Sequence, residues 1–158
     1  MLKKLTLVII GLIMIGGTLI IGACCPNNLG DSGGNIGKTP DNLVPLGTPL
    51  ALPAVSQELT VLGMNEEIVL GVRVITVTVK IKAIGPAQIS TTGLGDFDLV
   101  GSRGIIYTSN WFPTTGILAG ASITKDITFS FVNRDDSDFL LIWRALQYSG
   151  GSRFFALH

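Results

Sequence analysis

The chain has 158 residues, of which 47% are hydrophobic and 14% are charged, and its formal net charge is zero. This length predicts one domain with an extension, and the lack of a basic cluster argues against nucleic acid as a partner. Glycine is abundant, with 20 residues, and no segment of helical periodicity follows residue 25, so strands and turns are favoured.

The N-terminus combines a short basic start with a long uncharged run. Lys3 and Lys4 precede the run from Leu5 to Ala23, a pattern typical of a secretory signal over residues 1–23. The run is also long enough to form an uncleaved membrane helix. Both interpretations place the rest of the chain in the cell envelope, outside the cytoplasm.

The two cysteines stand side by side at the end of this run. The stretch "IGAC", Ile21 to Cys24, resembles the bacterial lipobox. The resemblance implies a lipid on the Cys24 thiol, cleavage before Cys24 and acylation of the new amino terminus, and several acyl chains anchor a protein durably. A disulfide between Cys24 and Cys25 would be strained, so the role of Cys25 stays open. With His158 as the one histidine, the chain lacks the four ligands of a structural zinc site.

Residues 24–49 are predicted to form a flexible linker. The segment is rich in Gly, Pro and Asn and has little apolar periodicity, so it buries too little surface to offset its chain entropy. Its second half, "LVPLGTPLALP", is expected to begin docking on the domain that follows.

Residues 50–158 are predicted to form that domain, because their apolar pattern has a period of two. Alternation over Arg73–Ala83 indicates a half-buried strand of an antiparallel sheet. Its expected core face carries Ile75, Val77, Val79 and Ile81, and its expected outer face carries Thr76, Thr78, Lys80 and Lys82.

A second alternating strand is predicted over Ser122–Val132, with Ile123, Ile127, Phe129 and Phe131 on the core face. The segment "FLLIWRALQY" is apolar on both faces and predicts a central strand with Trp143 in or near the core. Shorter strands are expected at "SQELTVLGM", "DFDLV", "IIYTSN" and "SRFFAL". About seven strands separated by Gly, Pro and Asn turns predict an all-β fold, an antiparallel β-sandwich.

The order of these segments resembles the telokin-like, immunoglobulin-like domain of unknown function found in bacterial lipoproteins and secreted proteins. The resemblance runs from about Pro49 to Leu157. It rests on a strand with Phe-x-Leu before a glycine turn and a tyrosine, and on a glycine turn before an alternating strand. The matching residues are Phe97, Leu99, Gly104, Tyr107, Leu118, Gly120 and Phe131. "AIGPA" departs from the asparagine that often follows the long strand. The resemblance implies an immunoglobulin-like sandwich without catalytic residues.

Two acidic clusters are candidates for chemistry. "RDDSD", Arg134 to Asp138, could ligate Ca²⁺ through oxygen atoms, but a solvated turn is the favoured interpretation. Asp96 and Asp98 could act as a general acid and a general base, but the simpler interpretation is that they lie on the solvent-exposed side of a strand. No "G-x-S-x-G" occurs and the histidine is terminal, so a histidine triad is implausible. We expect no catalytic residue, metal site or cofactor, and hence not an enzyme.

Two large aromatic residues, Trp111 and Phe112, stand in the predicted loop Thr108–Gly116. Exposed aromatics can anchor an envelope protein or a glycan. The alternative, which is favoured, is that they cap one end of the core.

Taken together, the sequence predicts a lipid-anchored, extracytoplasmic β-sandwich with a non-enzymatic binding or structural role. Two alternatives stay open. One is a metal-dependent or enzyme-accessory envelope protein, and the other is a structural spacer held by an uncleaved N-terminal helix.

Overall fold

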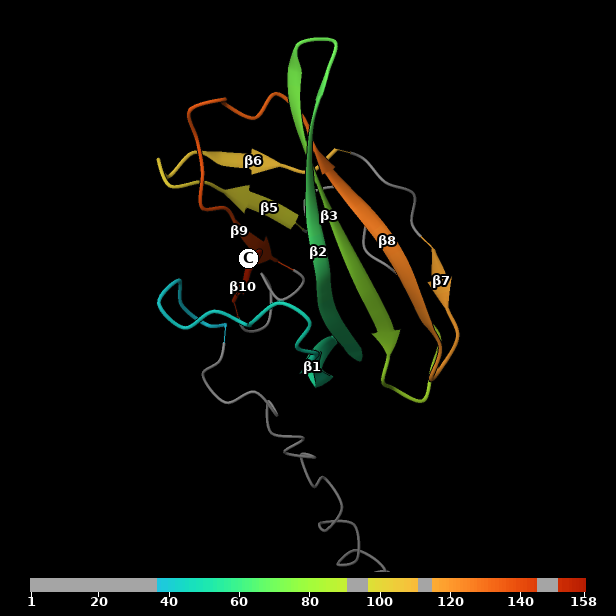
Figure 1. Cartoon of the computed structure of the whole chain (residues 1–158). Helices are drawn as coiled ribbons and strands as arrows, with labels where there is room; N and C mark the ends of the chain where they lie inside the picture. Colours follow the sequence, from blue (N-terminus) through green and yellow to red (C-terminus); the bar gives the residue numbers. More distant parts are fainter. Residues whose placement is uncertain (1–36, 91–96, 111–114, 145–150) are drawn as a thin grey trace, which may run out of the picture. The chain divides into compact units, whose positions relative to one another are not determined.

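The computed structural model describes residues 37–90, 97–110, 115–144 and 151–158. The predicted leader and Cys24 lie outside these residues, as do Asp96, Trp111 and Phe112. Within the described part of the chain, no helix is long and apolar enough to cross a membrane. The elements are β1 (Leu50–Leu52), a 3-10 helix (Pro53–Val55), β2 (Gln57–Val69), β3 (Val72–Ala83), β4 (Ile89–Ser90), β5 (Phe97–Val100), β6 (Ile106–Thr108), β7 (Gly116–Ile117), β8 (Ser122–Phe129), β9 (Leu140–Trp143) and β10 (Arg153–Ala156) (Figure 1).

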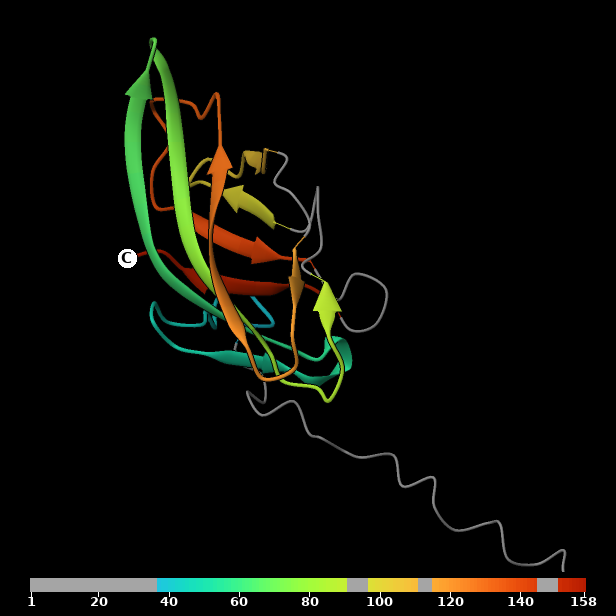
Figure 2. The same ribbon diagram turned by 90° about the vertical axis from the view of Figure 1, so that its right-hand side faces the viewer.

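The strands form two four-stranded sheets that face each other (Figure 2). One has the order β1-β2-β3-β8 and the other β10-β9-β5-β6, while β4 and β7 form a separate two-stranded ribbon. All pairings within these sheets are antiparallel. The predicted all-β, antiparallel sandwich is therefore confirmed.

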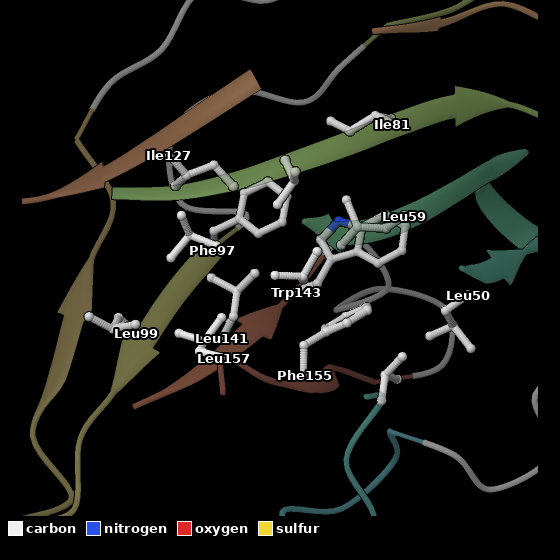
Figure 3. Packing of buried hydrophobic residues seen from close by; sticks show 14 of the residues in the cluster. Leu50, Leu59, Ile81, Phe97, Leu99, Ile127, Leu141, Trp143, Phe155 and Leu157 are labelled. Atoms are coloured by element: carbon white, nitrogen blue, oxygen red, sulfur yellow. The ribbon is translucent and has the colours of Figure 1, made fainter. Parts of the chain in front are cut away.

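The core lies between the two sheets and follows the predicted alternation of β3 and β8. Val77 pairs with Ile127 and Ile75 pairs with Phe129, and all four side chains are fully buried. The outer face of β3 is exposed or half-buried, as predicted. The second sheet contributes large side chains to the same core (Figure 3). Among these, Trp143 of β9 is buried and stacks on Phe97 at 6.4 Å between ring centroids.

The prediction that Phe131 faces the core is wrong. Strand β8 ends at Phe129, and Phe131 has a φ of 59° and is 80% exposed. A left-handed backbone breaks the alternation of side chains. Val132 is buried instead, and its N–H bonds to the Arg73 carbonyl at 3.2 Å.

Strands β2 and β3 form a long hairpin that extends past the rest of their sheet (Figures 1 and 2). β2 continues to Val69, beyond the predicted end at Met64, because the polar stretch after Met64 pairs fully with β3. A bulge between Val61 and Gly63 shifts the register. The turn at Leu70 and Gly71 has positive φ at both residues, which is the conformation of a tight two-residue hairpin turn.

The second half of the predicted linker contacts the sandwich. Val44 is fully buried and forms a bridge with Phe155 of β10. Its N–H bonds to the Phe154 carbonyl at 2.9 Å, and its carbonyl accepts from Ala156 N–H at 2.9 Å. One core residue thus comes from the segment before β1.

Candidate functional site

The loop predicted to bind a partner, Thr108–Gly116, is held at its start by both sheets. Ser109 N–H donates to the Phe97 carbonyl of β5 at 3.2 Å, and Asn110 N–H donates to the Thr128 carbonyl of β8 at 2.7 Å. The Asn110 amide also bonds to Ser130 Oγ at 2.8 Å. The described start of the loop is therefore fixed between the two sheets.

The loop is held at its other end by the ribbon of β4 and β7. Ile117 pairs with Ile89 and is 1% exposed. A Cβ added at Gly116 would approach the Gln88 amide nitrogen to 2.5 Å, so a side chain there would displace Gln88. Trp111 and Phe112 lie outside the described residues, and their binding role stays a prediction.

The "RDDSD" turn holds a buried carboxylate, which corrects the expectation of a wholly solvated turn. Asp136 is 1% exposed. Its Oδ1 accepts from the Ser102 hydroxyl at 3.1 Å and from Arg103 N–H at 3.0 Å, and its Oδ2 accepts from the Tyr107 hydroxyl at 2.9 Å. The backbone folds inward here because these donors lie on the turn before β6 and on β6 itself.

The electrostatics of Asp136 favour its charged form. Burial raises the pKa of this carboxyl, but the hydrogen bonds from Arg103 N–H, Tyr107 and Ser102 outweigh burial and leave the pKa below its ordinary value. Burial raises the pKa of the Tyr107 hydroxyl, which keeps it protonated as a donor. Across the described ranges no three His, Cys, Asp or Glu side chains gather as a metal site would require.

Arg73 ties the same turn to the β2–β3 hairpin. Its Nε and one terminal nitrogen each donate to a Glu66 oxygen at 2.8 Å, and the other terminal nitrogen donates to the Asn133 and Asp136 carbonyls at 2.7 Å. The guanidinium lies 5.2 Å from the centre of the Phe139 ring. The hydrogen bond from Arg73 lowers the pKa of Glu66. Arg73 is hydrogen-bonded to Glu66 and to two backbone carbonyls of the turn, and the cluster thereby stabilises the fold.

Asp98 is also buried, which corrects its predicted place on the wet side of a strand. It is 4% exposed and pairs with the Arg144 guanidinium at 2.6 Å. β5 lies between β9 and β6, and Arg144, which follows β9, covers the carboxylate. Asp98 is thus an ion-pair partner, while Asp96 lies outside the described residues.

The sequence reading missed an exposed apolar strand edge. Leu62, Met64, Ile68, Val69 and Leu70 are between 36% and 100% exposed. We call residues 62–70 the β2 edge. The run "IVLG" at a hairpin turn was a signal of it, because turns are usually polar.

No protein-family model matches the chain, and no curated protein matches it. Solved structures of the same fold do match. An uncharacterized β-sandwich protein from Clostridium difficile has a TM-score of 0.55 at 10% identity, covering 72% of this chain and 91% of its own. The YjhA protein from Bacillus subtilis has a TM-score of 0.52 at 14% identity, covering 73% and 100%.

The secreted protein MPT63 from Mycobacterium tuberculosis has a TM-score of 0.55 at 16% identity, covering 72% of this chain and 97% of its own. Identities this low show a shared fold and not a shared activity. The chain is similar to β-sandwich proteins, one of them uncharacterized and another secreted.

Proposed function

We propose that this chain is an extracytoplasmic β-sandwich, held at the cell envelope by lipid on Cys24, with a non-enzymatic binding role. The sequence segments from about Pro49 to Leu157 that resemble the telokin-like domain are the support for placing it in that family. The similarity to a secreted β-sandwich protein supports a location outside the cytoplasm. The "IGAC" stretch after an uncharged run supports lipid as the means of attachment.

The observation that supports the binding role is the way the described start of the loop Thr108–Gly116 is held. Its start is bonded to β5 through Ser109 and to β8 through Asn110. A fixed base reduces the entropy that a loop loses when it is bound, and aromatic side chains such as Trp111 bury much area with few rotamers. The loop is therefore a suitable carrier for a protein or glycan contact.

The two alternatives have weaker support. An enzyme accessory or metal-dependent protein would need polar groups that converge on a ligand, whereas Asp136, Asp98 and Arg73 are occupied by internal partners. A pure spacer would not need large aromatics in a loop. Neither alternative has a specific observation in its favour.

Anchoring is tested by replacing each cysteine in turn. Cys24→Ser is expected to abolish acyl labelling and to release the protein from membranes or to block its processing, because the lipid attaches to that thiol. Cys25→Ser is the matched control and should keep both the label and the membrane partition. Membrane partition and mass that stay unchanged in Cys24→Ser would contradict lipid attachment and support the helix anchor.

A further inference from the structure

Strand β2 has one free side over most of its length. β1 pairs with β2 only from Gln57 to Leu59, and Gly47 N–H then bonds to the Val61 carbonyl at 2.8 Å. From residue 62 to Val69, no other described strand pairs on that side, and Figure 2 shows the strand at the outer margin of its sheet. A free edge of this length is a template for another strand.

The backbone direction along this edge follows from the neighbouring pairings. Val132, just after β8, donates its N–H to the Arg73 carbonyl, so the backbone of Arg73 faces the β8 side of β3. Its partner across β3 is Ile68, whose N–H and C=O therefore face away from β3. By alternation, the backbone groups of Glu66 and Met64 face the same way. They are placed to bond with an added antiparallel strand.

The β2 edge is self-complementary about Glu66. When two copies run antiparallel with Glu66 opposite Glu66, apolar residues face apolar residues and Asn65 faces Glu67. The two Glu66 side chains are each already bonded to Arg73 through both oxygens, which removes the usual repulsion between like charges in opposite positions. The ladder pairs are Gly63 with Val69, Met64 with Ile68, and Asn65 with Glu67, and the turn residue Leu70 lies beyond them on the side of Leu62.

Leu70 gives an independent reason to expect a partner. It is fully exposed and has a φ of 50°, in a turn position that favours Asn, Asp or Gly. A leucine is unfavourable here because its apolar side chain is exposed to solvent and because a residue with a bulky side chain disfavours positive φ. Residues that break local rules without a folding benefit mark functional positions.

We propose that the protein forms a two-fold symmetric dimer in which the β2 edges of two copies pair antiparallel, centred on Glu66. The two sheets that contain β2 then become one continuous sheet, and the exposed apolar side chains of the edge cover one another. The contact is isologous, the arrangement expected of most homodimers. The occupant of the edge is a second copy because the pairing satisfies both its charges and its apolar positions.

The first test measures mass. The full-length protein in detergent should sediment as a dimer at micromolar concentration. Ile68→Lys places a cation against Met64 of the partner in each half of the dimer and should raise the dissociation constant at least ~10-fold. Ile106→Lys is the matched control, since Ile106 is 62% exposed and Ile68 is 61% exposed but Ile106 lies on β6 in the other sheet. This control should keep the wild-type constant.

The second test reads the register. Asn65→Cys and Glu67→Cys are made separately in full-length protein that also carries Cys24→Ser and Cys25→Ser. Directly opposite positions without hydrogen bonds between them lie about 4.5 Å apart between Cα atoms, which a disulfide can span. Each variant alone places its thiols diagonally, about 7–8 Å apart. Oxidation should therefore crosslink the mixture of the two variants and neither variant by itself.

Several results would overturn the proposal. They are a monomer at all concentrations, an equal loss of dimer in Ile68→Lys and Ile106→Lys, or crosslinking of each single variant as efficient as that of the mixture. A monomer would assign the free edge to a strand of another protein. The crosslinking result does not depend on lipid attachment, because these variants lack both Cys24 and Cys25.

Discussion

Asp136 is a buried carboxylate that accepts hydrogen bonds from the turn before β6 and from β6 itself. The Ser102 hydroxyl and Arg103 N–H bond to one oxygen, and the Tyr107 hydroxyl bonds to the other. Gly101 permits this approach, because a Cβ at residue 101 would overlap the Asp136 carboxylate. The side chain thus fixes the turn after β8 against the turn between β5 and β6.

Replacement of Asp136 should change both stability and its dependence on pH. Asp136→Asn replaces one of the two acceptor oxygens with an NH2 donor, which leaves a buried donor without its acceptor, and should lower the free energy of unfolding by about 1–3 kcal/mol at neutral pH. The neighbouring Asp135→Asn is the control. Asp135 is exposed, and its closest approach to Arg103 is 3.8 Å, so its loss should change stability by less than about 0.5 kcal/mol.

The sign of the pH effect follows from the lowered pKa of Asp136. A carboxyl with a lower pKa in the folded state stabilises the fold fully above its unfolded pKa of about 4. That contribution is lost as the pH falls through the lower folded-state pKa. Urea midpoints measured between pH 6 and pH 2 should therefore fall less in Asp136→Asn than in wild type. Equal slopes would mean that the charge of Asp136 adds no stability.

At the scale of elements, β8 shows where an alternating pattern stops being a strand. Ile127 and Phe129 are fully buried opposite β3, whereas Phe131 lies two residues past the end of the strand and is exposed. The left-handed backbone at Phe131 lets Val132 enter the core. The alternation of apolar and polar residues continues through Phe131, but the extended backbone conformation does not.

Phe129 and Phe131 form a matched pair for a stability test. Phe129→Ala should lower the free energy of unfolding by roughly 3–5 kcal/mol, because it leaves a cavity between the sheets. Phe131→Ala should change it by less than about 0.5 kcal/mol, because the ring is exposed. Denaturant unfolding of both variants measures the difference, and similar losses would contradict the observed end of β8.

For the molecule as a whole, the predicted binding role of Trp111 can be separated from a role in stability. Trp111→Ala is expected to weaken capture of a crosslinked partner from intact cells while the thermal midpoint stays nearly unchanged. Phe131→Ala, which removes an exposed aromatic elsewhere, should leave capture intact. A Trp111→Ala variant that loses stability and capture together would show that Trp111 caps the core.

Local patterns in the sequence were enough to predict the class of fold and most of the core. Strict alternation over β3 and over Ile127 and Phe129 identified the buried faces, because a strand that is apolar on one side can bury only that side. Trp143 was also predicted correctly, since an apolar segment on both faces indicates a central strand. These properties depend on residues close together in the chain.

The burial of the acidic residues and the free side of β2 depend on how the sheets pack in three dimensions. Asp98 and Asp136 look solvated beside their neighbours in sequence, yet Arg144 and the hydroxyl of Tyr107 reach them from other elements. The free side of β2 depends on where β1 ends in the sheet, which no local pattern encodes. Burial and pairing over long sequence separations arise only when the sheets pack, and that is why the sequence could not supply them.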